Sequence, residues 1–258
     1  MKRSQKSVLG IIPARYDSTR LPGKPLAMIG SRSMVMRVYA QALQARNLDH
    51  LYVATDDVRI LRHVTEAGGK ALMTRKTHPS GTSRCLEALE QLEQQGNHIF
   101  DVVINIQGDE PFLDPGEIEK LIAAYEQGFE GIASLCTPIR EETELFNPNV
   151  VKVVLDAQGK ALYFSRQPIP YLTGRETKEW ASAGLYRRHI GVYAFSVLSL
   201  RQTASLQPDR NEMAESLEQL RWLAAGIPIR MLESESLSQG IDCEQDLARA
   251  RKRVETEE

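Results

Sequence analysis

A basic loop follows the first apolar run of the chain. Arg15, Arg20 and Lys24 lie within ten residues, and two prolines and a glycine frame the lysine. Guanidinium groups chelate phosphate oxygens and a lysine adds a mobile point charge, so such a loop could hold a polyphosphate. A solvated basic loop would have the same composition. The rigid frame around Lys24 favours a phosphate clamp.

Two aspartates are candidate ligands for a divalent cation. Asp109 follows the apolar run DVVINIQ (101–107), and Pro111 would end the hydrogen-bonded ladder there. Mg²⁺ in proteins takes one or two carboxylates together with phosphate oxygens. The alternatives for Asp109 are a cap of the helix that begins at Pro115 or a plain turn acid. Asp242 could instead be an N-cap whose capping-box partner is Gln245.

Other motifs restrict the chemistry further. The sequence contains neither GxxxxGK[ST] nor GxGxxG, which argues against Walker-type NTPases and standard dinucleotide-binding proteins. No Ser-His-Asp or Cys-His arrangement is recognisable. His189 is more simply a hydrogen-bonded structural residue, and Arg166 could pair with a carboxylate ligand or with a surface acid. Nucleotidyl transfer is the remaining use of a phosphate loop on this type of fold.

Alternating strands and helices must position these residues. Such alternation predicts a mostly parallel sheet with crossover helices, and ligands bind at the carboxyl ends of its strands. The predicted strands cover 7–13, 51–55, 71–74, 101–107, 132–138, 189–195 and 227–232. The predicted helices cover 34–43, 58–67, 82–95, 115–127, 211–225 and 243–254.

Residues 150–164 break this alternation. Two apolar runs joined by Asp-Ala-Gln-Gly (156–159) predict a β-hairpin, and 171–187 has the weak periodicity of a loop. No internal repeat or low-complexity linker separates these segments from the rest. The hairpin and the loop are therefore expected to be an insertion in one nucleotide-binding domain.

Composition excludes several classes of protein. The 258 residues are 42% hydrophobic and 26% charged, which disfavours disordered, collagen-like and coiled-coil chains. Basic residues (32) nearly balance acidic ones (34), so we expect neither nucleic acid nor a membrane surface as a partner. No apolar stretch approaches the roughly 18 residues that span a bilayer, and no signal peptide is recognisable. Three widely spaced cysteines predict neither a disulfide framework nor a zinc site, and a cytoplasmic location fits best.

Nine sequence blocks in one order resemble the 3-deoxy-manno-octulosonate cytidylyltransferases, also called CMP-Kdo synthetases. The blocks are IIPARYDSTRLPGKPL (11–26), VATDD (53–57), HPSGTSR (78–84), NIQGDEPF (105–112), FNPNVVKVVLD (146–156), ALYFSRQPIP (161–170), HIGVYAF (189–195), LEQLRWL (217–223) and GID (240–242). The resemblance runs from Val8 to about Arg251. The first loop alone would indicate only the broader nucleotide-sugar pyrophosphorylase class, whereas FSR and HIGVYAF indicate the Kdo enzymes.

The resemblance implies a fold and a reaction. The expected fold is a mostly parallel, Rossmann-like sheet of the nucleotide-sugar transferase (GT-A-like) type, with an inserted β-hairpin dimerisation subdomain. One nucleotidyltransferase domain would cover 1–258, with 146–195 as the insertion that contributes to the sugar site and the homodimer. The expected reaction joins CTP and an eight-carbon sugar acid into CMP-Kdo and pyrophosphate, with Mg²⁺, for lipopolysaccharide synthesis.

The resemblance also implies roles for individual residues. Arg15 and Lys24 would hold the triphosphate and are the catalytic candidates. The turn Ser80, Gly81 and Thr82 would lie against the cytosine, with Gln107 as a further nucleotide-binding residue. The Mg²⁺ ligands would be Asp109 and Asp242. The sugar-acid pocket would contain Arg20, Arg166, His189, Tyr193, Glu215 and Gln219.

The chain departs from the family pattern at two places. Ser83 stands where the family usually has Asp or Glu, which removes a charge beside Arg84 near the base. Cys243-Glu244 replace the usual Thr-Pro after the metal aspartate, which removes a helix-starting proline. We expect neither change to abolish the reaction.

Two other functions compete with this interpretation. One is a CMP synthetase for a related acid, either an amino-substituted octulosonate or sialic acid. The other is a non-catalytic nucleotide-sugar sensor on the same fold. Such a sensor could lose Lys24, Asp109 or Asp242 without penalty, and this sequence keeps all three.

Overall fold

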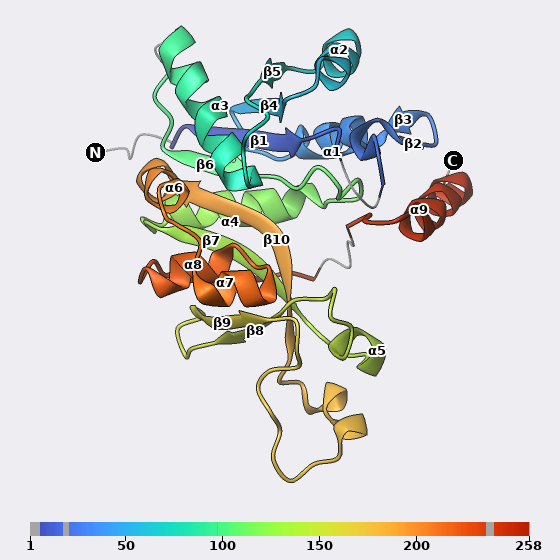
Figure 1. Cartoon of the computed structure of the whole chain (residues 1–258), viewed down its shortest axis with the longest axis vertical. Helices are drawn as coiled ribbons and strands as arrows, with labels where there is room; N and C mark the ends of the chain where they lie inside the picture. Colours follow the sequence, from blue (N-terminus) through green and yellow to red (C-terminus); the bar gives the residue numbers. More distant parts are fainter. Residues whose placement is uncertain (1–5, 18–20, 97, 236–239, 258) are drawn as a thin grey trace. The chain divides into compact units, whose positions relative to one another are not determined.

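The computed structural model describes residues 6–17, 21–96, 98–235 and 240–257 and divides the chain into two compact units (Figure 1). The first unit comprises residues 1–128 and 236–258, and the second comprises residues 129–235. Arg20 lies outside the described residues. Among the helices of the described ranges, none is long and apolar enough to cross a membrane.

Four parallel strands form the sheet of the first unit. They are β1 (Val8–Ala14), β4 (His50–Thr55), β5 (Ala71–Met73) and β6 (Val102–Asn105), in the order β6-β1-β4-β5. The central strand β1 is buried on both faces, since Leu9, Ile11 and Ile12 are all 0% exposed. Its charge-free sequence predicted this burial. The α/β class with a mostly parallel sheet is confirmed.

The helices of the first unit follow its strands. They are α1 (Met34–Ala42), α2 (Val58–Glu66), α3 (Gly81–Gly96), α4 (Pro115–Glu126) and the C-terminal α9 (Glu244–Glu257). The cap of α4 is Asp114, whose carboxylate accepts a hydrogen bond from Gly116 N at 2.9 Å. The alternative role of Asp109 as the cap of this helix is therefore excluded, because Asp114 caps it.

A short segment between β1 and α1 was not expected to have regular structure. It contains the 3-10 helix η1 (Lys24–Leu26) and the small antiparallel pair β2 (Met28–Ile29) and β3 (Arg32–Ser33). Two-residue strands lie below the length at which alternation is detectable in a sequence.

The second unit has its own strands and carries the predicted hairpin. Strand β7 (Ile132–Pro138) pairs antiparallel with β10 (Arg187–Ser196) and parallel with β11 (Ile229–Glu233). The hairpin consists of β8 (Lys152–Leu155) and β9 (Ala161–Ser165), and β8 also pairs with β10. The loop expected over 171–187 contains two short 3-10 helices, η2 (Thr177–Glu179) and η3 (Ala181–Ala183). Its buried Trp180 and Tyr186 pack with Ile139 and Leu145.

The helix predicted over 211–225 is wrong as a continuous element. The structure has α7 (Arg210–Glu215) and α8 (Gln219–Ala224), separated at Ser216, whose φ of 53° is left-handed. Arg166 donates hydrogen bonds to the backbone oxygens of Glu215 and Ser216, which removes acceptors that a continuous helix would use. The short helices α5 (Glu142–Leu145) and α6 (Val197–Ala204) were also not predicted.

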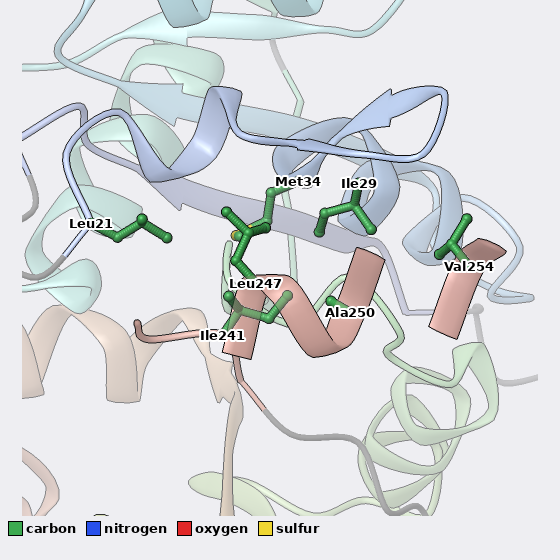
Figure 2. Packing of buried hydrophobic residues seen from close by; sticks show 7 residues of the cluster. All are labelled: Leu21, Ile29, Met34, Ile241, Leu247, Ala250 and Val254. Carbon is green, nitrogen blue, oxygen red and sulfur yellow. The ribbon is translucent and has the colours of Figure 1, made fainter. Parts of the chain in front are cut away.

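The C-terminal helix packs onto the first unit through an apolar stripe (Figure 2). Leu247, Ala250 and Val254 are spaced at i, i+3 and i+7, and all are buried. They form one cluster with Leu21, Ile29, Met34 and Ile241. Leu21 lies within the basic loop, three positions before Lys24, and Ile241 directly precedes Asp242. The cluster therefore fixes two chain segments that carry predicted site residues.

Candidate active site

A cavity of about 340 Å³ lies in the first unit at the carboxyl ends of its strands. It is lined by Pro13, Ala14, Arg15, Lys24, Pro25, His78, Pro79, Ser80, Gly81, Arg84, Gln107, Gly108, Asp109 and Asp242. All the nucleotide-binding and metal candidates line it except Thr82, which is buried in the first turn of α3. The structure thus brings together residues that the sequence separates by more than two hundred positions.

Lys24 lies between the two candidate metal ligands. Its Nζ is 2.7 Å from Asp109 Oδ2 and 3.0 Å from Asp242 Oδ1. The lysine side chain is only 13% exposed, so solvent screens these attractions less than on an open surface. The two carboxylates together therefore form a cation-binding pair.

The donor set fits a hard divalent cation that also binds phosphate. Among the described residues, no group of three or more His, Cys, Asp or Glu side chains is arranged to hold a metal ion. A cation at Asp109 and Asp242 would therefore complete its shell with oxygens from a ligand and from water. Mg²⁺ is bound in this way in nucleotide sites, and Lys24 marks the position where positive charge is stabilised.

Backbone contacts position the two aspartates. A Cβ atom at Gly108 would lie 2.9 Å from Pro13 O, so only glycine allows β1 to approach the residue before Asp109. Ile241 N donates a hydrogen bond to Asp109 O at 2.9 Å. This bond joins the segment that carries Asp242 directly to the one that carries Asp109.

The cap of α9 differs from the expected one by one position. Asp246 Oδ2, rather than Gln245, accepts hydrogen bonds from the backbone N–H of Asp242 and of Cys243, each at 3.0 Å. The helix begins at Glu244, which places Asp246 where a capping-box acid belongs. Burial raises the pKa of Asp246, but the Asp242 N–H, the Cys243 thiol and Arg249 outweigh it and lower the pKa to about 2. The cap leaves the Asp242 side chain to interact with Lys24.

The turn before α3 shows how the chain accommodates Ser83. Ser83 Oγ donates to Ser80 O at 3.0 Å, and Ser83 N donates to Ser80 Oγ at 3.3 Å. The neighbouring Arg84, only 4% exposed, forms an ion pair with Asp56 at 2.8 Å. Arg84 therefore does not need an acid at position 83, and the serine closes the turn instead.

A contact that the sequence did not reveal holds the basic loop. Gly23, at φ 68°, donates its N–H to Tyr16 O at 3.1 Å. The Arg59 guanidinium lies 3.3 Å from the centroid of the Tyr16 ring and also binds both carboxylate oxygens of Asp57. The hydrogen bond from Arg59 holds the pKa of Asp57 at about 2. Nothing in the spacing of Tyr16 and Arg59 indicates this contact, because it joins the basic loop to the first turn of α2, more than forty positions later in the sequence.

Arg166 and Glu215 meet in the second unit. Glu215 accepts hydrogen bonds from Ser165 Oγ at 2.6 Å and from Arg166 N at 2.9 Å. The Arg166 guanidinium donates to Glu215 O at 2.7 Å and to Pro148 O at 3.0 Å. Gln219 begins α8 just beyond and is 5% exposed.

His189 and Tyr193 also lie together, with ring centroids 5.2 Å apart. His189 Nε2 is 3.0 Å from Ser134 Oγ, and burial lowers the pKa of His189 to about 3. The imidazole is therefore neutral near pH 7. Burial also raises the pKa of Tyr193 well above its usual value, and the Tyr193 hydroxyl has no hydrogen-bond partner among the described residues. A buried hydroxyl without a partner is uncommon in folded proteins, which makes Tyr193 a candidate for a polar ligand contact.

Several known proteins of similar sequence and structure are named for one activity. The model of the cytidylyltransferase family matches residues 9–233. The 3-deoxy-manno-octulosonate cytidylyltransferase of Cytophaga hutchinsonii is 45% identical over 95% of this chain and 97% of its own. That of Parabacteroides distasonis is 44% identical over 94% and 96%. A solved structure of CMP:2-keto-3-deoxy-manno-octonic acid synthetase complexed with CTP superimposes with a TM-score of 0.88 at 39% identity, over 98% of this chain and all of that one.

Loss of the Arg59 contact should weaken binding of CTP. In an Arg59→Ala variant the Tyr16 ring loses its cation, and such contacts contribute about 1 kcal/mol at exposed sites, or about fivefold in affinity. We expect the dissociation constant for CTP, measured by titration calorimetry, to rise by about that factor. Arg62→Ala, on an exposed position of the same helix, should leave it unchanged. Equal constants for wild type and Arg59→Ala would contradict a role for this contact in holding the loop.

Proposed function

The chain belongs to the cytidylyltransferase family, and from this premise we propose that it activates 3-deoxy-manno-octulosonate with CTP, giving CMP-Kdo and pyrophosphate for lipopolysaccharide synthesis. The observation that carries the proposal is the meeting of Lys24, Asp109 and Asp242 in one cavity beside the turn 80–82. The names of the similar proteins support the same substrate. We place the reaction in the cytoplasm, with no nucleic acid or membrane partner.

We propose Mg²⁺ as the cofactor, held by Asp109 and Asp242. When bound, the ion would neutralise charge on the phosphates and on the leaving pyrophosphate. Lys24 and Arg15, which line the same cavity, would bind the triphosphate oxygens. The Lys24 ammonium lies within 3.0 Å of both aspartates, and binding of the ligands would exchange these partners for phosphate oxygens.

The transfer step needs positioned charge and no covalent intermediate. The anomeric hydroxyl of the sugar acid attacks the α-phosphorus of CTP and loses its proton to solvent, a new P–O bond forms, and the bond to the pyrophosphate oxygen breaks. Arg15 and Lys24 stabilise the charge that develops on the phosphate oxygens. The sequence lacks a nucleophile motif, which agrees with direct in-line attack.

Recognition of the cytosine is assigned to the turn Ser80, Gly81 and Thr82, with Gln107. Hydrogen bonds between Ser80 and Ser83 and the start of α3 at Gly81 keep this turn in one conformation. Backbone oxygens of such a turn accept a hydrogen bond from the cytosine amino group, and uracil would leave them facing a carbonyl.

Recognition of the sugar acid is assigned to Arg20, Arg166, His189, Tyr193, Glu215 and Gln219. The neutral His189 would serve as a hydrogen-bonding group rather than as a cation, since its pKa is about 3. The positive charge for the sugar carboxylate would come from the arginines. We further propose that residues 1–258 act as one nucleotidyltransferase domain with 146–195 as an insertion, although the two compact units carry different groups of these residues.

We propose that the hairpin forms the contact of a homodimer. Leu162 and Tyr163 on β9 are 60% and 36% exposed, and Tyr171 beyond the hairpin is 75% exposed. Apolar side chains gathered at one hairpin indicate a surface that a partner covers, and a second copy is the commonest partner.

The oligomeric state tests this assignment. Wild type at micromolar concentration should sediment as a dimer, and Leu162→Glu should shift the protein towards monomer because it buries a charge in the contact. Ile99→Glu, an equally drastic change at an exposed position of the first unit, should not. A monomeric wild type would rule the dimer out.

Pyrophosphate release from each of four NTPs tests the function. We expect release only with CTP and only when 3-deoxy-manno-octulosonate is present. Parallel assays with an amino-substituted octulosonate and with sialic acid identify the acid that is used. Comparable turnover with UTP would contradict the role of the turn 80–82, and CTP binding without turnover on any acid would indicate a sensor.

The metal assignment predicts a large effect of Asp109→Asn. The amide keeps the shape of the side chain but removes the charge that holds the cation as the transition state forms, so turnover should fall by about two to three orders of magnitude. Asp114→Asn is the matched control, because asparagine caps a helix as well as aspartate does. Near-normal turnover of Asp109→Asn at saturating Mg²⁺ would show that Asp109 is not a metal ligand.

A further inference from the structure

Lys152 is a buried cation that the proposed mechanism does not use. It lies in β8 with 0% of its surface exposed. Its ammonium donates hydrogen bonds to three backbone oxygens, those of Asn147 at 3.0 Å, Val150 at 2.6 Å and Arg166 at 2.5 Å. One side chain therefore ties the segment before β8 to the residue that follows β9.

Hydrogen bonds hold both the backbone and the side chain of Arg166. Its carbonyl accepts from Lys152, and its guanidinium donates to the backbone oxygens of Pro148, Glu215 and Ser216. The guanidinium has five N–H groups, and these three bonds use one each on Nε, Nη1 and Nη2. Among the described residues, one N–H on Nη1 and one on Nη2 therefore remain for a ligand. Two N–H groups on neighbouring nitrogens are the pair that a carboxylate accepts.

Burial of the charged ammonium of Lys152 lowers the free energy of unfolding, a penalty that a buried apolar side chain would not carry. No carboxylate oxygen of a described residue lies within 4.0 Å of its ammonium, and three neutral carbonyls compensate only part of the lost hydration. A methionine of similar length would fill the same space. The geometry of the three bonds, rather than packing, is thus what a lysine provides here.

We propose that Lys152 is a positioning residue for the sugar acid: it fixes the backbone of Arg166 and of residues 147–150, so that the guanidinium is held ready for the substrate carboxylate. The inference rests on the proposed function, because it takes Arg166 as a contact of the sugar acid. It assigns Lys152 no contact with CTP or with the metal.

Titration of Lys152 would expose this role. Burial lowers the pKa of Lys152 to about 8, with Glu215 and Glu144 opposing and Arg166 assisting the shift. Below that pH the ammonium supplies all three hydrogen bonds, and above it the neutral amine has only two N–H groups for three oxygens. The charged groups that face it from neighbouring elements are Glu144, Arg166, Arg188 and Glu215. Tyr163 has a pKa raised above its usual value of 10.0.

The experiment compares Lys152→Met with Lys160→Met, the same change at an exposed position of the same hairpin. For Lys152→Met we expect the KM for the sugar acid to rise about tenfold while the KM for CTP stays within twofold. Lys160→Met should match wild type. In wild type the KM for the sugar acid should rise as the pH passes through about 8, and this rise should be absent in Lys152→Met.

Different failures give different results. An unchanged KM for the sugar acid in a folded Lys152→Met overturns the inference, as does an equal rise for CTP and sugar acid, which would show general damage. If Lys152→Met does not fold, the wild-type pH dependence decides, and a KM that is flat from pH 7 to 9 overturns the inference. If wild type turns over CTP only with a different acid, the proposed substrate is wrong. The KM values of Lys152→Met and Lys160→Met are then compared with that acid.

Discussion

Two carboxylates that repel each other share one cavity in this protein, and the proposed site for a cation and a nucleotide depends on holding them together. Asp109 and Asp242 come from the two separate segments of the first unit, and Lys24 lies within hydrogen-bond distance of both. An ammonium between two acids offsets their mutual repulsion, which partial burial would otherwise strengthen. The packing around the site maintains this arrangement. Gly108 lets β1 approach the Asp109 segment, Asp246 caps the backbone of Asp242, and the apolar stripe of α9 anchors the helix (Figure 2).

The sequence was sufficient for the parts of the fold that depend on local pattern. The charge-free run 7–13, the hairpin and the predicted helices other than 211–225 appear where expected, because burial and periodicity leave a direct trace in residue order. Lys24, Asp109 and Asp242 could be singled out because each lies in a segment that follows a predicted strand or precedes a predicted helix. The structure brings all three to one cavity.

The remaining features depend on contacts between residues far apart in the chain. The break between α7 and α8 has neither glycine nor proline to announce it, since Ser216 is held in its conformation by Arg166 from the hairpin. Arg59 stacks on Tyr16, and Arg84 finds its partner in Asp56 instead of at position 83. In the sequence, Lys152 is one polar residue within an apolar run. Its three carbonyl partners cannot be predicted from that run, because they belong to the segments before β8 and after β9.

The separation of Lys24 and Asp242 by 218 positions also affects how the chain folds. Contacts of such long range form after local ones, because a large loop must close before they are gained. The local pairs β1–β4 and β8–β9 can assemble while the C-terminal helix is still unattached. Asp109 and Asp242 come together only when α9 packs against the rest of the first unit, so an incompletely folded chain lacks this pair of carboxylates. On the proposed function, binding of Mg²⁺ together with CTP would therefore stabilise the fully folded chain by mass action.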